Sequence, residues 1–169
     1  PCWFLDPEVC KFNSHFAFPQ TSASCADYVK GLQGNRSAVV MAVYHREDNK
    51  HIGNISLQAI NPINRSAEIA FIFGEKSYWG KGFAHSAACL LINHAFDVLN
   101  CYRIYCGTAS GNIGMQKVAE KLGMTQEGLR RDAGYLHGEF QDMLEYGLFK
   151  HKCERGQSNQ GESDQGKAI

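Results

Sequence analysis

Short apolar runs separated by polar turns characterise the first half of the chain. Residues 38–44 form a continuous apolar run typical of a buried strand, and a polar turn at 46–50 separates it from a second strand at 51–57. The two runs predict a hairpin. A third strand is expected at 67–73, where Glu68 is one charge in an otherwise apolar run. A charge in such a strand needs a structural or a chemical explanation.

Helical periodicity appears in the second half of the chain. Apolar residues at three- and four-residue spacing predict an amphipathic helix over 83–99. A strand at 102–106 and a short helix at 113–122 follow, with Asn112 placed to cap that helix. A last strand is expected at 141–149. This order of strands, helix, strand, helix and strand predicts an α/β or α+β fold, in which helices flank a sheet.

Residues 1–30 have a mixed character. Asp6-Pro7 predicts the start of a short helix, because proline fits the first helical position, and Thr21-Ser22 predicts the cap of a second helix that runs through Tyr28. Both helices lie before the first predicted strand.

Length and charge limit the possible classes of function. The 169 residues suffice for one core, and we expect a single domain over 1–150 with a polar, disordered tail at 151–169. Lys+Arg and Asp+Glu both number 17, so the charge favours neither nucleic acid nor a membrane as partner. Seven scattered cysteines without a C-x-x-C pair predict reduced thiols and no metal site, and the sequence has no apolar run near the ~20 residues that cross a bilayer. We expect a cytoplasmic protein.

A glycine pair precedes the long predicted helix, in the segment Tyr78-Trp79-Gly80-Lys81-Gly82-Phe83-Ala84. A phosphate site needs such glycines, because backbone amides can then approach the ligand in front of the positive helix end. Glycine turns before helices are common, however, so the pair alone favours a plain turn. The spacing matches neither a P-loop nor a G-x-G-x-x-G motif.

In its context this segment resembles the GNAT superfamily of N-acetyltransferases, specifically its RimJ/RimL-type branch. The other matching blocks are Ala67-Glu68-Ile69, Asn112 with Glu120-Lys121-Leu122-Gly123-Met124, and Glu127-Gly128 with Arg130-Arg131-Asp132. They occur in the order and spacing of the family. Members usually begin with a strand that this sequence does not show, so the first strand of the domain is expected to be missing.

The resemblance implies a mixed, mainly antiparallel sheet that is splayed at the acetyl-CoA site. The pyrophosphate of acetyl-CoA is then expected on the amides of Trp79, Gly80, Lys81, Gly82, Phe83 and Ala84. The pantetheine arm is expected beside Phe71, Ile72 and Phe73, with a further contact from Asn112. Lys81 either adds a charge near a phosphate or points into water.

Catalysis requires a route for proton removal, because an alkyl amine is almost entirely protonated near neutral pH. The equivalent of Glu68 acts as general base in some family members; the alternative is a structural hydrogen bond at the strand entrance. A backbone N–H of the splayed strand can polarise the thioester carbonyl. The usual proton donors are replaced by Ala119 and Met115, so we name Tyr135 as candidate donor, with packing on the sheet as the alternative.

The sequence therefore predicts an acetyl-CoA-dependent N-acetyltransferase that transfers its acetyl group directly to a primary amine, without a metal. The acceptor is either a protein N-terminus or a small molecule such as a nucleotide-linked amino sugar, bound by residues 6–28 and 135–140. A catalytically inactive acyl-CoA-binding module is the alternative, because the usual donors are absent. A homodimer is possible, since similar proteins often form one.

Overall fold

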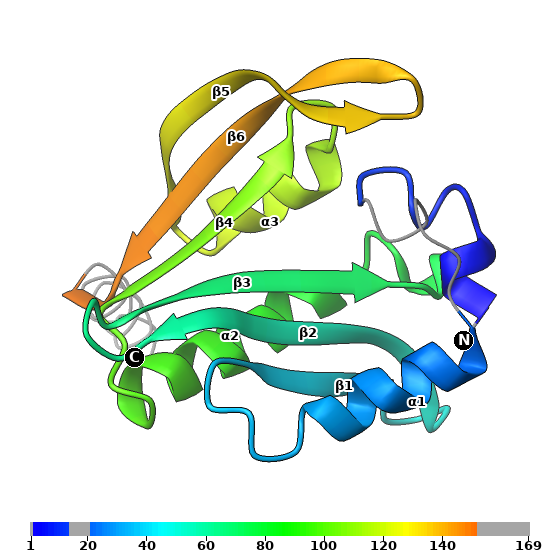
Figure 1. Cartoon of the computed structure of the whole chain (residues 1–169), viewed down its shortest axis with the longest axis horizontal. Coiled ribbons are helices and arrows are strands. Elements are labelled where there is room, and N and C mark those ends of the chain that lie inside the picture. The colour runs from blue at the N-terminus through cyan, green and yellow to red at the C-terminus, as the bar shows by residue number, and fades with distance from the viewer. Residues whose placement is uncertain (1, 14–20, 152–169) are drawn as a thin grey trace, which may run out of the picture.

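A twisted sheet of six strands forms the centre of the computed structural model, which describes residues 2–13 and 21–151 (Figure 1). The strands lie in the order β1-β2-β3-β4-β6-β5. Their bounds are β1 Val39–His45, β2 Lys50–Asn61, β3 Ser66–Phe73, β4 Arg103–Ala109, β5 Thr125–Leu136 and β6 Glu139–Phe149. The helices are α1 Ser22–Gly31, α2 Phe83–Asp97 and α3 Ile113–Lys121, with short 3-10 helices at Cys2–Leu5 and Lys76–Tyr78.

All neighbouring strands are antiparallel except β3 and β4, which are parallel. The predicted mixed, mainly antiparallel sheet is thereby confirmed. The single parallel pair is short, because it joins only Ser66 to Arg103, Ala67 to Ile104 and Glu68 to Tyr105. After these three pairs the two strands separate, as Figure 1 shows.

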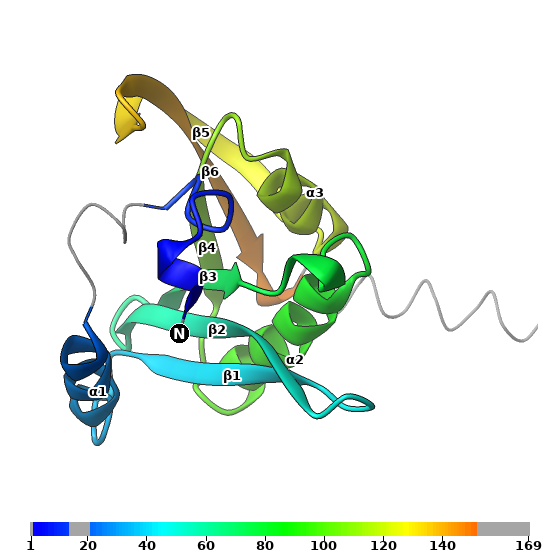
Figure 2. The same cartoon turned by 90° about the vertical axis from the view of Figure 1, so that its right-hand side faces the viewer.

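Helices α2 and α3 cover the same face of the sheet, and the hydrophobic core lies between them and the strands (Figures 1 and 2). The periodicity that predicts α2 follows from this packing, since Ala88, Leu91, Ile92, Ala95 and Phe96 are its buried residues. Helix α1 lies on the opposite side of the sheet (Figure 2) and has no buried residue. None of the helices in the described part of the chain is long and apolar enough to cross a membrane.

The predicted strands and helices are confirmed with shifted ends, and Thr21 caps α1 as expected through a capping box with Ser24. One expectation was wrong, and one strand was missed. Residues 7–12 form turns instead of the helix expected at Asp6-Pro7, which the 3-10 helix Cys2–Leu5 precedes. Strand β5 was not predicted, because most of its side chains are exposed and it therefore lacks apolar alternation. The predicted disordered tail lies outside the described residues, apart from His151.

Candidate functional site

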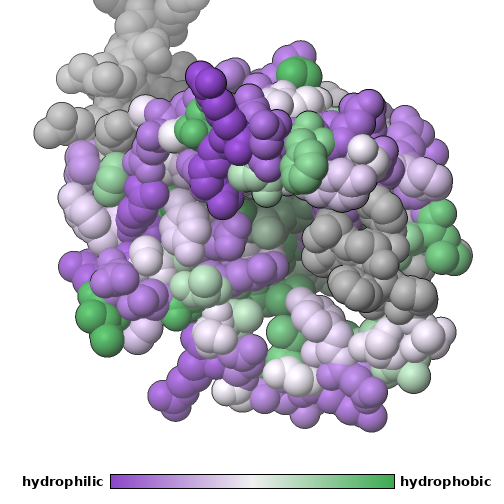
Figure 3. All heavy atoms as spheres, turned by 45° about the horizontal axis from the view of Figure 1, so that its top comes forward, coloured by the Kyte–Doolittle hydropathy of each residue, from purple (hydrophilic) through white to green (hydrophobic). Residues whose placement is uncertain are grey.

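The gap between β3 and β4 begins directly after Glu68 and Tyr105, the last pair of the parallel ladder. From Ile69 onward β3 is paired with β2 alone, whereas β4 continues along β6 as far as Ala109 and Met143. The sheet is therefore divided into two halves that share only one end. On the face seen in Figure 3, a recess with an apolar floor opens between them.

The alternation of peptide groups along β3 shows which of them face this gap. The N–H of Gly74 donates to the carbonyl of Ile52 over 3.1 Å, so even-numbered positions of β3 direct their peptide groups toward β2. The carbonyl of Arg65 accepts from the N–H of Arg103 over 3.1 Å, which places odd-numbered positions toward β4. The N–H of Ile69 still closes the last parallel pair with Tyr105, so the groups directed at the gap are the carbonyl of Ile69 and the peptide groups of Phe71 and Phe73.

Helix α2 begins beside the open end of β3 with a backbone that offers amides to an anion. Its N-cap is Gly82, at φ +86°, which has no side chain to cap the helix. The first amide bonded within the helix is that of Ser86, to the carbonyl of Gly82 over 3.0 Å. The three preceding N–H groups therefore have no helical acceptor. A Cβ added at Gly80 or Gly82 would meet no atom within 4 Å, so the space over these residues is open.

Trp79 connects the glycine-containing segment 78–84 to β3, because its Nε1 donates to the carbonyl of Phe73 over 2.8 Å. The carbonyl of Phe73 is one of the groups facing the gap, and the hydrogen bond from Trp79 already satisfies this carbonyl. The Nζ of Lys81 lies 5.5 Å from the centroid of the Tyr78 ring. This position agrees with both readings of Lys81, a charge near a phosphate and an exposed lysine.

The β1–β2 turn supports the segment from the other side. The hydroxyl of Tyr78 donates to Asp48, and Nδ1 of His45 lies 2.8 Å from the same carboxylate. These contacts lower the pKa of Asp48, chiefly through the hydrogen bond from Tyr78. The His45 ring also packs edge-on against Phe83, the first residue of α2, with 5.1 Å between ring centroids.

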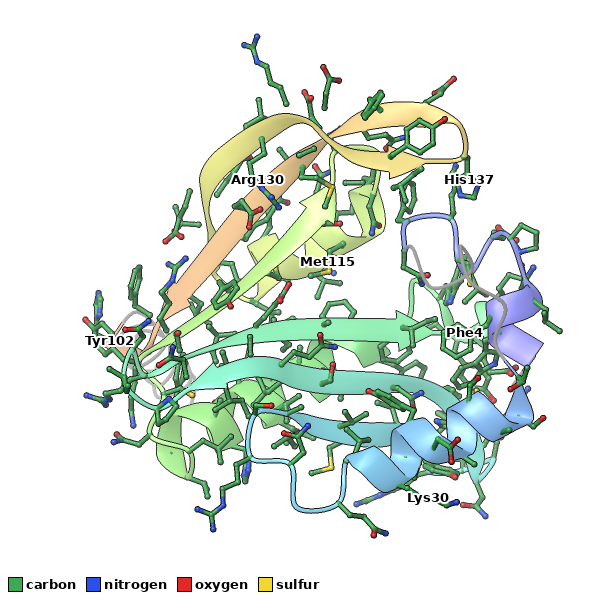
Figure 4. All side chains as sticks on the ribbon, viewed as in Figure 1. Phe4, Lys30, Tyr102, Met115, Arg130 and His137 are labelled. Atoms are coloured by element: carbon green, nitrogen blue, oxygen red, sulfur yellow. The ribbon has the colours of Figure 1, made fainter. Side chains whose placement is uncertain are left out.

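Asn112 caps α3, and its Oδ1 accepts from the N–H of Met115 over 3.2 Å. The side-chain amide NH2 group remains as a donor toward a ligand. Met115 packs against the hydrophobic core, and in Figure 4 its side chain lies between α3 and β3. Ala119 is completely buried. The two positions that would hold the usual donors are therefore part of the apolar packing beside the gap.

Glu68 lies on the face of the sheet opposite the core, because its neighbours Ala67 and Ile69 are the buried residues of β3. Its side chain is half-buried. Desolvation raises the pKa of this carboxyl, and the negative charge of Glu145 raises it further. A raised pKa brings a carboxylate closer to the value that suits a general base near neutral pH.

Tyr105 and Glu145 share this face with Glu68. Tyr105 is the direct partner of Glu68 across the β3–β4 pair, and Glu145 of β6 is the partner of Gly107 on β4. Burial raises the pKa of Tyr105, and the charge of Glu68 adds to the effect. Sequence reasoning missed both residues. Their alternation on strands was visible, but the register that brings them to Glu68 was not.

Two arginines accompany these carboxylates. Arg103 pairs with Glu127 at 2.6 Å between Nη2 and Oε2, and Arg130 pairs with Glu145 at 2.7 Å between Nη2 and Oε1. Figure 4 shows Arg130 beside β6. Among the described residues, Glu68 is the carboxylate of this face for which no cationic partner is observed.

Cys106 lies beneath this group on the core side of β4. Burial, together with the charges of Glu68 and Glu145, raises the pKa of its thiol to about 12. The thiol is therefore neutral at physiological pH, and the side chain packs in the hydrophobic core.

Tyr135, the candidate proton donor, lies near the end of the β5–β6 hairpin. It is 63% exposed, and its ring packs on that of Phe140 with 5.0 Å between centroids. The structure thus does not bring Tyr135 together with Glu68, whereas it does bring Tyr105.

The N-terminal segment 2–13 crosses the open end of the gap, from the end of β3 to the β5–β6 hairpin (Figures 1 and 2). At one end the Trp3 ring covers Gly74, and its Nε1 donates to Glu75 over 3.0 Å. At the other end Nε2 of His137 lies 3.0 Å from the carbonyl of Lys11, and Figure 4 shows His137 at the hairpin turn. Residues 14–20, part of the expected acceptor region 6–28, lie outside the described residues.

Comparison with known proteins agrees with this geometry. The family model of the acetyltransferase (GNAT) domain matches residues 2–125, and the chain belongs to this family. Three similar proteins are YdaF of Bacillus subtilis, the spermidine N(1)-acetyltransferase of Escherichia coli K12 and the ribosomal-protein-serine acetyltransferase of the same organism. YdaF is 36% identical over 107 residues, or 63% of this chain. The spermidine acetyltransferase is 30% identical over 105 residues, or 62% of this chain. The ribosomal-protein-serine acetyltransferase is 31% identical over 134 residues, or 76% of this chain. The chain spans 58%, 56% and 74% of the three proteins.

The fold also matches solved structures. The spermidine N-acetyltransferase from Vibrio cholerae, in complex with CoA and spermine, superimposes with a TM-score of 0.80 over 90% of this chain and 88% of that one. The sequence identity is 23%, so this likeness concerns the fold.

Proposed function

We propose that this protein is an acetyl-CoA-dependent N-acetyltransferase that transfers an acetyl group directly to a primary amine. The observation that carries the proposal is the division of the sheet after Glu68, which leaves peptide groups of β3 facing a gap beside the uncapped N-terminus of α2. The thioester of acetyl-CoA supplies the activated acetyl group. Membership of the family supports the same reaction class.

The residues present fit this co-substrate. The pyrophosphate is assigned to the amides of the segment Trp79–Ala84, because these N–H groups lie at a positive helix end under open space. Beside β3, the N–H and C=O of Phe71 and the N–H of Phe73 are assigned to the pantetheine amides. Ile72 contributes less, since its peptide groups face β2. Asn112 adds its side-chain NH2 group.

Glu68 is the proposed general base, directly or through a water molecule. Its position at the closed end of the gap makes it half-buried and still reachable, and its raised pKa suits proton removal from an ammonium group. The gap-facing N–H of Phe71 polarises the thioester carbonyl, because it is already fixed in place.

For the leaving thiolate we propose Tyr105 in place of Tyr135 as the proton donor. Tyr105 lies opposite Glu68 in the last pair of the ladder, whereas Tyr135 is exposed on the hairpin. Because burial raises its pKa, the Tyr105 hydroxyl keeps its proton at neutral pH. Departure as a free thiolate is the competing route.

The acceptor is proposed to carry a single amino group at the reacting end, as a protein N-terminus does. The carboxylates of Glu127 and Glu145 are already matched by arginines, which leaves Glu68 to receive one ammonium group. A polyamine, the substrate class named for the Escherichia coli relative, would need further unmatched carboxylates along its length. The homodimer and the cytoplasmic location stay predictions.

The second candidate function is an inactive acyl-CoA-binding module. The apolar packing of Ala119 and Met115, at the positions of the usual donors, favours it. It requires the same co-substrate site and differs only in turnover.

Two measurements on the whole chain separate these functions. Calorimetry measures acetyl-CoA affinity, and thiol release measures turnover with a serine-starting tripeptide, a nucleotide-linked amino sugar and spermidine. We expect binding, with turnover of the peptide or the amino sugar. Binding without turnover of any amine would favour the inactive module, and absence of binding would reject both functions.

A further inference from the structure

The carboxylate of Glu145 forms an ion pair with Arg130 beside the proposed active site. Its Oε1 accepts a hydrogen bond from Nε of Arg130 over 2.8 Å, and Nη2 of the same guanidinium lies 2.7 Å from this oxygen. A hydrogen bond between two ionised groups is stronger than one between neutral groups. Both oxygens lie over Gly107, because a Cβ added there would be 3.4 Å from Oε2 and 3.5 Å from Oε1. The carboxylate therefore lies directly above β4.

Strand register places this carboxylate on the same face as Glu68. Glu68 is opposite Tyr105 on β4, Tyr105 is opposite Gly147 on β6, and Glu145 lies two residues from Gly147. Because side chains two residues apart point to the same face, the two carboxylates lie on one face, with β4 between them and an offset of two residues along the strands. Two like charges so arranged in a half-buried site interact unfavourably.

From these contacts we propose that Glu145, fixed by Arg130, is a positioning residue of the proposed reaction, which makes Glu68 a stronger proton acceptor. A negative charge beside Glu68 destabilises its ionised form and so favours the uptake of a proton from the acceptor ammonium. Arg130 limits this effect, since its positive charge is paired with the carboxylate of Glu145. The inference rests on the proposed function, because it assigns Glu68 the role of base.

Several other groups face Glu68 or its partners, and each is accounted for. Arg103 is engaged by Glu127 and lies 5.6 Å over the Tyr105 ring, and the Cys106 thiol is neutral. The groups of the neighbouring strands are Gln58 on β2, Arg103, Tyr105 and Cys106 on β4, Glu127 and Arg130 on β5, and Glu145 on β6.

Paired variants with opposite expected effects test the proposal through the pH profile of kcat/KM. The acid limb of this profile is the range in which kcat/KM falls as the pH decreases, because the base becomes protonated. In Glu145→Gln the acid limb should move to lower pH, because loss of the neighbouring negative charge makes Glu68 easier to ionise. The plateau rate should fall roughly two- to tenfold, because a weaker base transfers protons less effectively. In Arg130→Gln the acid limb should move to higher pH. A merely structural role would not give shifts of opposite sign.

Glu127→Gln is the matched control. It removes a salt bridge of the same type on the same face, with Arg103, while Glu68 and Glu145 keep their charges. We expect its acid limb to coincide with that of the wild type. In a Glu68→Gln background, Glu145→Gln should leave the remaining profile unchanged. Equal acid limbs in the wild type and in folded Glu145→Gln protein would overturn the proposal.

A second readout keeps this test separate from the proposed function. The carboxyl carbon of Glu68, observed by NMR in the protein without acetyl-CoA, reports its titration without any turnover. We expect its midpoint to fall in Glu145→Gln and to rise in Arg130→Gln. If the wild type transfers no acetyl group, the proposed function fails. If the midpoint is the same in all three proteins, the coupling between Glu145 and Glu68 fails, whatever the activity.

Discussion

Replacing Gly82 by valine should abolish tight acetyl-CoA binding while the protein still folds. Gly82 has φ +86°, and a Cβ built on it meets no protein atom within 4 Å. The substitution therefore causes no clash within the protein, and its cost to stability is backbone strain. Strain at a left-handed position costs about 1–3 kcal/mol, which lowers Tm by roughly 2–12 °C at about 2–4 °C per kcal/mol.

The effect on binding has a different origin, because the side chain enters the space in front of the free amides of α2. Calorimetry with acetyl-CoA should show at least a tenfold loss of affinity, which is about 1.4 kcal/mol. Gly123→Val is the matched control. Gly123 has φ +74° and also meets no atom within 4 Å, but it follows the C-terminus of α3. The control should lose similar stability and keep its affinity within about twofold.

Comparison of the two variants removes the common contribution of strain. If Gly82→Val binds acetyl-CoA as the wild type does, while circular dichroism shows it folded, the amides of this segment do not hold the pyrophosphate. If both variants lose affinity equally, the loss reflects general destabilisation. The first result refutes the placement of the co-substrate on the N-terminus of α2, and the second removes the affinity loss of Gly82→Val as support for it.

Three further changes test other parts of the site. Because the raised pKa of Glu68 makes the folded state bind its proton more tightly than the unfolded chain does, stability falls as pH rises through that pKa. Glu68→Gln should therefore raise Tm at pH 8 more than at pH 4 and lower kcat about 10²–10⁴-fold at pH 7; an equal gain in Tm at both pH values would contradict the burial argument. Tyr105→Phe should lower kcat while Tyr135→Phe does not, and the reverse result in stopped-flow thiol release would restore Tyr135 as donor. Gly74→Ala places a Cβ 2.0 Å from the Trp3 ring, so chemical denaturation should show a loss of about 1–3 kcal/mol, and an unchanged midpoint would show that the N-terminal segment is not packed there.

Much of the fold could be predicted from the sequence, because its buried elements carry periodic apolar residues. The helix α2 and the strands β1 to β4 and β6 all have such patterns, and burial in one core explains them. Strand β5 could not be predicted in this way. It is an edge strand with mainly exposed side chains and two irregularities in its pairing with β6. Its sequence therefore lacks the alternation of apolar and polar residues that predicts a strand.

In the candidate site, too, residues with a local sequence pattern could be predicted, and residues brought together only by strand pairing could not. The glycine-containing segment 78–84, to which we assign the pyrophosphate in our proposal, could be singled out from the sequence, because two glycines and a helix start lie within a few consecutive residues. The carboxylate Glu68 was visible as a charge in an apolar strand. Its partners Tyr105 and Glu145 were not, since they come from strands distant in the sequence and only the register of three neighbouring strands unites them.

The short β3–β4 pair explains why Glu68 suits a base better than any other position on β3. One residue pair earlier, at Ala67 and Ile104, the ladder is closed and the side chains are fully buried. Beyond Glu68 the strands part, and a carboxylate there would face the opening and keep its ordinary proton affinity. At the last pair, the side chain has a neighbouring strand on both sides and the open gap in front. Desolvation sufficient to raise the pKa and access for an amine thus coincide at this one position.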